Sequence, residues 1–235
     1  MMREYWSPAH TMTSTKRFLF ALGFFAAVSC LGVSTCSAQI EMLKIVFRRS
    51  SPQIAPESAE AKPMTLYIAG DKYTRIEYPV DPANHTQMLI ITKEPDNWRI
   101  NLVDRTAIHV LDPGPTFVSR NPIVWSPKPP GQPDPYEPFR DLEFGNETIF
   151  FRQNNPRDLG DRNIDGKNTK VSAIKAGGVE VTLFRDPEAD KPVRIDLTKD
   201  GKPVMSFHYL QYDTKVPFDP TLFQLPEGIK VSEAK

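Results

Sequence analysis

The sequence predicts a mainly β protein built on about eleven antiparallel strands. Short runs rich in β-branched and aromatic residues end repeatedly at Gly, Pro, Asp or Asn, and many of the connections between them have the length of a hairpin turn. Helical periodicity is scarce, so a second layer of long helices is not expected. A chain of this length can bury one substantial core without metals or disulfides, which favours a single domain.

The expected strands fall into two groups. They are residues 40–49, 64–69, 72–78, 87–92, 97–103 and 106–111, followed by 147–152, 169–174, 179–184, 192–198 and 203–212. The strand at 192–198 alternates apolar and polar side chains, as a strand with one wet face does. The strands at 40–49, 87–92 and 203–212 are apolar on both sides. Their second face needs cover from curling of the sheet, from a helix or loop, or from a bound apolar ligand.

Helices are expected to be few and short. Residues 138–145 are compatible with two turns, and Asp219 is a good N-cap because Pro220 follows it at the first helical position. Residues 121–138 contain seven prolines and should therefore be extended. Two interpretations of this Pro-rich segment stay open: a loop packed on the surface, or a lid over the open side of the sheet.

The N-terminus resembles a secretory leader. Lys16 and Arg17 precede an apolar run at 18–33, and small residues then suit cleavage after Ala38. We therefore expect a signal peptide at 1–38, with Met12 as an alternative start, and a single mature domain at 39–235. The sixteen apolar residues are fewer than the roughly 20 that a membrane-spanning helix needs, which disfavours a retained anchor. The expected location is periplasmic or extracellular.

Cysteine and charge usage exclude several classes of protein. Both cysteines, Cys30 and Cys36, lie within the leader, and neither sits in a good lipoprotein signal, so lipid anchoring is disfavoured. The mature chain then has no cysteine for a disulfide or a thiol nucleophile. The 29 basic and 29 acidic residues are interspersed, so no basic surface for nucleic acid is expected.

Catalytic and metal-binding motifs are absent from the sequence. The mature histidines, His85, His109 and His208, lack metal-ligand spacing, and no nucleophile elbow, metalloprotease motif or P-loop is present. We therefore expect no enzyme activity, no cofactor and no metal. A hydrolase remains only a third alternative, without any residue assigned to catalysis.

Residues 161–166, DRNIDG, match the first half of an EF-hand calcium loop. The match fails at Ser172, where the pattern requires a bidentate glutamate. Asx and Gly residues are also typical of tight turns. The interpretation as turn and strand-entry residues is favoured over a calcium site.

The order of strands and turns resembles the LolA/LolB-like superfamily of outer-membrane lipoprotein-sorting proteins. The resemblance rests on GDKYTRIEY (70–78), on NWRINLVDRTAIHVLDPGP (97–115) and above all on the ending FDPTLFQLPEG (218–228). It implies a strongly curved antiparallel sheet that forms an incomplete, half-open β-barrel, with a few short helices or a Pro-rich loop over the concave face. In that family the concavity holds acyl chains. The Pro-rich segment departs from the family, which has a helical lid there.

Two functions follow as hypotheses. The first is a non-catalytic, monomeric binding protein that shelters a lipid or a lipoprotein acyl chain in the curved sheet, where each buried methylene contributes about 0.8 kcal/mol. The second is an envelope scaffold or sensor that contacts a partner protein and fills the sheet with its own side chains. Candidate ligand-lining residues for the first are Phe47, Leu66, Ile68, Ile76, Trp98, Ile100, Phe151, Leu183 and Phe207.

Overall fold

The computed structural model describes residues 41–124 and 131–234, all within one of the two units of the chain, Ala38–Lys235. The expected signal peptide and the middle of the Pro-rich segment, 125–130, lie outside the described residues. Within the described ranges, no helix combines the length and apolar character needed to cross a membrane.

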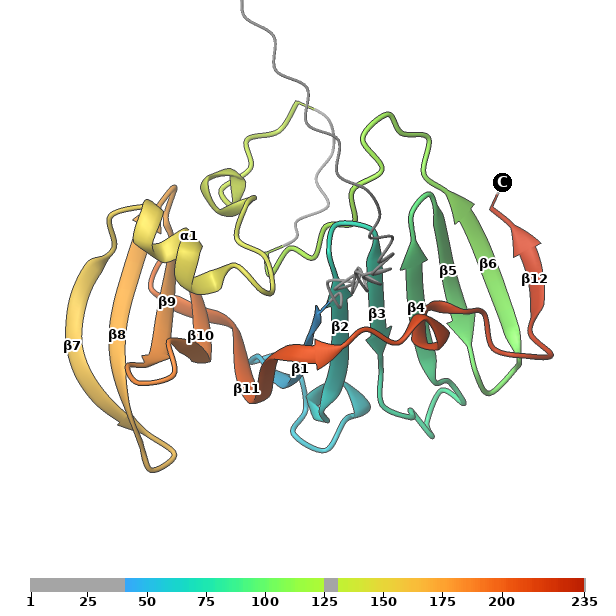
Figure 1. Ribbon diagram of the computed structural model, residues 1–235. Coiled ribbons are helices and arrows are strands. Elements are labelled where there is room, and N and C mark those ends of the chain that lie inside the picture. The colour runs from blue at the N-terminus through green and yellow to red at the C-terminus, as the bar shows by residue number, and fades with distance from the viewer. Residues whose placement is uncertain (1–40, 125–130, 235) are drawn as a thin grey trace, which may run out of the picture. The chain divides into compact units, whose positions relative to one another are not determined.

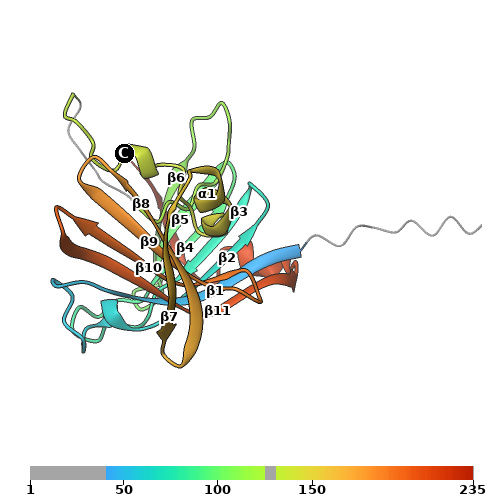
Figure 2. The ribbon, with the colours of Figure 1, turned by 90° about the vertical axis from the view of Figure 1, so that its left-hand side faces the viewer.

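Twelve strands form one open, curved sheet, which Figure 1 and Figure 2 show from two directions. Its order is β12-β6-β5-β4-β3-β2-β1-β11-β10-β9-β8-β7, so β12 and β7 are edges that do not pair with each other. All neighbours are antiparallel except β12, which runs parallel to β6. The strands are β1 (Glu41–Ser50), β2 (Met64–Ala69), β3 (Tyr73–Glu77), β4 (Met88–Lys93), β5 (Asp96–Asn101), β6 (Thr106–Leu111), β7 (Arg157–Ile164), β8 (Lys167–Ala176), β9 (Val179–Asp186), β10 (Lys191–Lys199), β11 (Lys202–Pro217) and β12 (Lys230–Glu233).

The predicted fold class is confirmed, because the structure is a large curved antiparallel sheet that does not close, with only short helices. One strand assignment was wrong. Residues 147–152 belong to the helix α1 (Glu147–Gln153), which packs against β8, β9 and β10. Its buried residues are Glu147, Phe150 and Phe151, at the i, i+3, i+4 spacing of one helical face, whereas Ile149 is 47% exposed.

Two strands were missed. β7 is almost wholly exposed and polar, so it carries no apolar alternation, and β12 has only four residues, all exposed. The described residues also contain three 3₁₀ helices: η1 (Ala59–Ala61), η2 (Glu137–Phe139) and η3 (Pro220–Phe223). The expected cap of η3 is confirmed, because the Asp219 side chain accepts a hydrogen bond from the Thr221 N–H. The two turns expected at 138–145 shorten to η2.

The DRNIDG stretch forms the hairpin between β7 and β8. Ile164 pairs with Lys167, which leaves a two-residue loop of Asp165 and Gly166 with φ values of 50° and 83°. Positive φ at both positions is the geometry of the tight turn that matches strand twist. The turn interpretation of these residues is therefore confirmed.

Both faces of the N-terminal half of the sheet are covered. One face, here called the inner face, carries Ile45, Phe47 and Leu66 and packs against residues 119–124 and 136–151, the inner cover. The other face, the outer face, carries Leu89, Ile91 and Ile100 and packs against residues 218–229, the outer cover, whose Phe223 is 1% exposed. The demand for cover on both faces, expected from the two-sided strands, is met by these two segments.

A buried carboxyl group links the inner cover to β11. Glu147, the first residue of α1, is fully buried, and its carboxylate oxygens accept hydrogen bonds from the hydroxyls of Tyr209 (2.8 Å) and Tyr212 (2.9 Å) and from the Gly145 N–H (3.0 Å). Gly145 has φ 99°, and a Cβ there would lie 2.9 Å from the Leu43 side chain, so glycine is required at this approach. Burial raises the pKa of Glu147, because desolvation outweighs the hydrogen bonds that favour the charged carboxylate.

The raised pKa makes the stability of the fold depend on pH. The native state favours the protonated carboxyl, so this stabilisation is complete below the ordinary pKa of glutamate and is lost as pH rises through the higher folded pKa. We expect Glu147→Gln, which stays neutral, to gain stability relative to the natural protein as pH rises. The expected result is a smaller loss of stability from pH 5 to pH 8 in Glu147→Gln than in the natural protein, measured by urea unfolding at the two pH values. The exposed Glu188→Gln is the control. Equal pH dependence in all three proteins would contradict the prediction.

Candidate functional site

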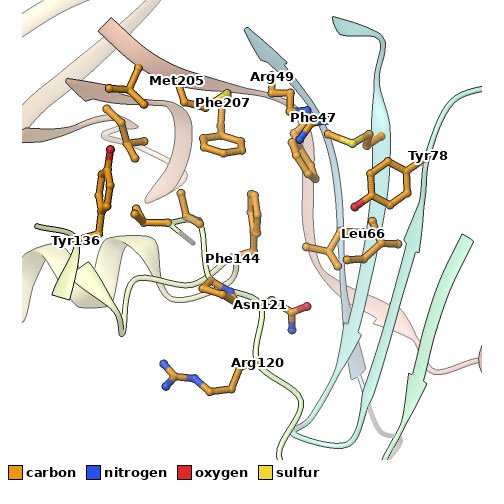
Figure 3. Close-up of a pocket in the computed structure, with 17 residues that line it drawn as sticks. Phe47, Arg49, Leu66, Tyr78, Arg120, Asn121, Tyr136, Phe144, Met205 and Phe207 are labelled. Atoms are coloured by element: carbon orange, nitrogen blue, oxygen red, sulfur yellow. The ribbon is translucent and has the colours of Figure 1, made fainter. Parts of the chain in front are cut away.

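An apolar pocket of about 490 Å³ lies between the inner face of the sheet and the inner cover (Figure 3). Its volume is within the range of about 300–1,000 Å³ that is typical of small-molecule sites. Strands β1, β2, β3, β10 and β11 form one side, and the inner cover forms the other. The lining residues are Phe47, Arg49, Met64, Leu66, Ile76, Tyr78, Arg120, Asn121, Pro122, Ile123, Val124, Tyr136, Phe144, Leu197, Val204, Met205 and Phe207.

Strand alternation and register bring the sheet side together. Residues 45, 47 and 49 of β1 point to the inner face, and Arg49 pairs with Phe207 of β11. Across β2, Leu66 pairs with Ile76 of β3, which places both on the same face. The alternation of apolar residues along each strand thus produces a continuous apolar surface.

Three aromatic rings lie where sheet and cover meet. The ring of Phe144, from the inner cover, lies 4.7 Å from that of Phe47 and 5.6 Å from that of Phe207, while the last two rings are 6.0 Å apart. Tilted and edge-on arrangements at such distances are favourable for aromatic pairs. Figure 3 shows the three side chains facing one another across the pocket.

Hydrogen bonds fix the position of the inner cover beside the pocket. The buried hydroxyl of Thr74 in β3 contacts the Ser119 hydroxyl (2.8 Å) and accepts a bond from the Asn121 side-chain amide (3.1 Å). The Phe144 N–H donates to the Asn121 carbonyl (2.9 Å), and the Ile123 N–H donates to the Leu142 carbonyl (3.0 Å). These hydrogen bonds therefore hold the inner cover in a fixed position against the sheet.

The two arginines of the pocket differ in their partners. Arg120 donates to Glu143 (2.6 Å) and to Asp141 (2.9 Å), and these acids raise its pKa further. The Nε of Arg49 is buried and has no hydrogen-bond partner among the residues that the structure describes. Its nearest carboxylate oxygen, from Glu60, lies 3.5 Å from Nη2, and the Glu60 side chain is 61% exposed.

The nine candidate ligand-lining residues separate into three groups. Four of them line the pocket: Phe47, Leu66, Ile76 and Phe207. Three belong to or pack against the core of the inner face outside the pocket: Ile68, Phe151 and Leu183. Trp98 and Ile100 lie with the outer-face core, where the Trp98 ring stacks on His109 at 5.4 Å.

Sequence reasoning missed several residues of the pocket, including Arg49, Tyr78 and Phe144. A signal for Arg49 was present, because it continues the inward row of Ile45 and Phe47 at a spacing of two. Phe144 and residues 120–124 carried no such signal, because they belong to irregular backbone. In the described parts of the chain, no group of three or more His, Cys, Asp or Glu side chains could hold a metal ion.

Comparison with known proteins finds only distant similarities. No family model and no curated protein matches the sequence. Among solved structures, the chain is similar to an uncharacterized conserved protein from Thermus thermophilus, with 10% identity and a TM-score of 0.45 over 83% of this chain and 91% of that one. It is also similar to MucB, with 13% identity and a TM-score of 0.41 over 81% of this chain and 59% of that one.

A third similar structure is the Mycobacterium tuberculosis lipoprotein LppX, with 10% identity and a TM-score of 0.35 over 77% of this chain and 90% of that one. Similarities this distant do not assign the chain to a family.

The Thr74 hydroxyl should be important for holding the inner cover in place beside the pocket. We expect Thr74→Val to destabilise the protein by about 1–3 kcal/mol, because it leaves the buried Asn121 amide without this acceptor. The matched control is Thr65→Val, which lies on the outer face of the neighbouring strand β2 and cannot reach the inner cover. Chemical denaturation of both variants is the measurement. Equal effects would show that the hydrogen bond does not contribute.

Proposed function

We propose that the protein is an exported, non-catalytic binding protein that holds a lipid or acyl chain in the inner-face pocket. The observation that supports it is the pocket itself, about 490 Å³ of space lined mainly by apolar and aromatic side chains. An acyl chain gains about 0.8 kcal/mol for each methylene that it buries there. In this proposal Phe47, Leu66, Ile76 and Phe207 are the ligand contacts.

The proposal also includes export of the protein and its membership of the LolA/LolB-like superfamily. The leader at 1–38 would direct the mature chain to the periplasm or the extracellular space, where a lipid carrier is useful because acyl chains are insoluble in water. The open curved sheet with short helices agrees with the expectation drawn from the LolA/LolB-like resemblance. Membership of that superfamily is part of the proposal.

A second candidate function is an envelope scaffold or sensor that binds another protein. It is favoured by the extent to which the protein fills its own inner face, since Phe139, Leu142 and Phe151 of the inner cover are each at most 2% exposed. The edge strand β7 gives this second function less support. β7 is polar and contains an irregularity between Asp158 and Asp161, features that discourage pairing with another strand.

Lipid uptake distinguishes the two functions. Residues 39–235, exported and purified without detergent, should carry a stoichiometric lipid or take up an added fatty acid, as measured by native mass spectrometry. A protein that arrives empty and takes up no lipid would contradict lipid binding and favour the second function.

Filling the pocket should abolish this uptake. In Ile76→Trp the indole would occupy space in the pocket, and displacing only two methylenes of the ligand costs about 1.6 kcal/mol, or at least a roughly tenfold loss of affinity. The matched control is Ile108→Trp, at a 49% exposed position of β6 outside the pocket. Trp98→Ala, on the outer face, should also bind normally. Unchanged uptake by Ile76→Trp would exclude this pocket as the site.

A further inference from the structure

We propose that Arg49 makes the pocket selective for amphiphiles with one apolar chain and an anionic oxygen head group, whose carboxylate or phosphate it binds. The inference rests on the proposed function and adds the chemical class of the ligand. In strand β1, the side chains of Ile45, Phe47 and Arg49 point to the inner face of the sheet. The alternation of β1 predicts a third apolar side chain at position 49, but the residue there is an arginine with a permanent positive charge.

The environment of the Arg49 guanidinium is incompletely satisfied. Its side chain is only 29% exposed, and its Nε has no hydrogen-bond partner among the described residues. A buried donor without a partner destabilises the folded protein, and more so when the group is charged. The single nearby acid, Glu60, makes a long contact to Nη2 from the solvent side and leaves Nε without an acceptor.

Arg49 is one of the residues that line the pocket. Figure 3 shows the guanidinium nitrogens of Arg49 next to the ring of Phe47, at the opposite end of the view from Arg120. A guanidinium presents parallel N–H groups that match the two oxygens of a carboxylate or phosphate. An apolar chain lying along Phe47 and Phe207 would place its head group within reach of this end.

The charge balance of the lining favours an anion. The described lining residues include two arginines and no Asp or Glu. The charge of Arg120 is already compensated by Glu143 and Asp141, at 2.6 Å and 2.9 Å. Arg49 is therefore the lining cation with a donor left for a ligand. A cationic head group would leave that donor unpaired, and a neutral hydroxyl would accept a weaker hydrogen bond than a carboxylate or phosphate does.

Paired ligands test this inference. Palmitate and hexadecanol have the same chain length and differ in the charge of the head group, and hexadecyl phosphate supplies the other oxyanion. Affinities are measured for the mature protein at pH 8 by displacement of a fluorescent apolar probe, below the micelle concentration of each ligand. Arg49→Gln should weaken palmitate or hexadecyl phosphate by about ten- to a hundredfold, the equivalent of one charge-assisted hydrogen bond, and leave hexadecanol within about twofold.

Two further variants serve as controls. Arg49→Lys keeps the charge and loses the planar fork, so its loss for the anions should be intermediate. Arg48→Gln removes the neighbouring charge on the outer face, where Arg48 pairs with His208, and should bind all ligands normally. Thermal unfolding of each variant establishes that it is folded.

The outcomes separate this inference from the proposed function. A selective loss of the anionic ligands in Arg49→Gln supports it, and the tighter of palmitate and hexadecyl phosphate identifies the head group. Equal losses for anions and hexadecanol, or no loss at all, would overturn it while leaving lipid binding intact. Failure of the natural protein to bind any of the three ligands would overturn the proposed function as well.

Discussion

The structure depends on one constraint: the N-terminal half of the sheet, β1 included, is apolar on both faces, so the sheet must be covered twice. Ile45 and Phe47 need cover on the inner face, and Met42 needs it on the outer face. The two covers come from distant parts of the chain: residues 119–124 and 136–151 form the inner cover, and residues 218–229 form the outer cover.

The pocket exists because the inner cover is incomplete. Toward β8, β9 and β10 the helix α1 presses Phe150 and Phe151 against the sheet, and Glu147 ties it to Tyr209 and Tyr212. Near β2 and β3 the inner cover has irregular backbone, and a hydrogen bond from Asn121 to Thr74 attaches it to the sheet. This irregular segment leaves space beside the sheet that a packed helix would fill. The space that remains is apolar on nearly every side, and its one unsatisfied donor among the described residues belongs to Arg49.

The sequence was informative where a local pattern carried the structural signal. The six N-terminal strands, the two-sided character of β1 and β4, and the Asp219 cap all rest on local spacing or turn chemistry, and the structure contains them. The same prediction for residues 203–212 of β11 was wrong, because a register shift in its pairing with β1 places Tyr212 on the inner face with Tyr209 and Leu210 is 52% exposed. The helix α1 was missed because Ile149, Phe150 and Phe151 also suit a strand, although Glu147 with the two phenylalanines already had helical spacing.

The pocket was only partly predictable for a different reason. Alternation states which residues of one strand share a face, but it does not state which face of the next strand is the same one. That information lies in the register between strands. Register places Trp98 opposite Ile91 on the outer face, whereas Ile76 pairs with Leu66 on the inner face. Residues of the inner cover depend on tertiary packing, which no local pattern encodes.

The pairing of β1 with β11 also sets an order for folding. Glu41 pairs with Pro217 and Phe47 with Tyr209, so β1 lacks its β11 partner until nearly all of the described chain has been synthesised. Contacts between such distant residues close large loops and make folding slow. Until that closure, β1 keeps a hydrogen-bonding edge and apolar faces open, a state that is prone to aggregate.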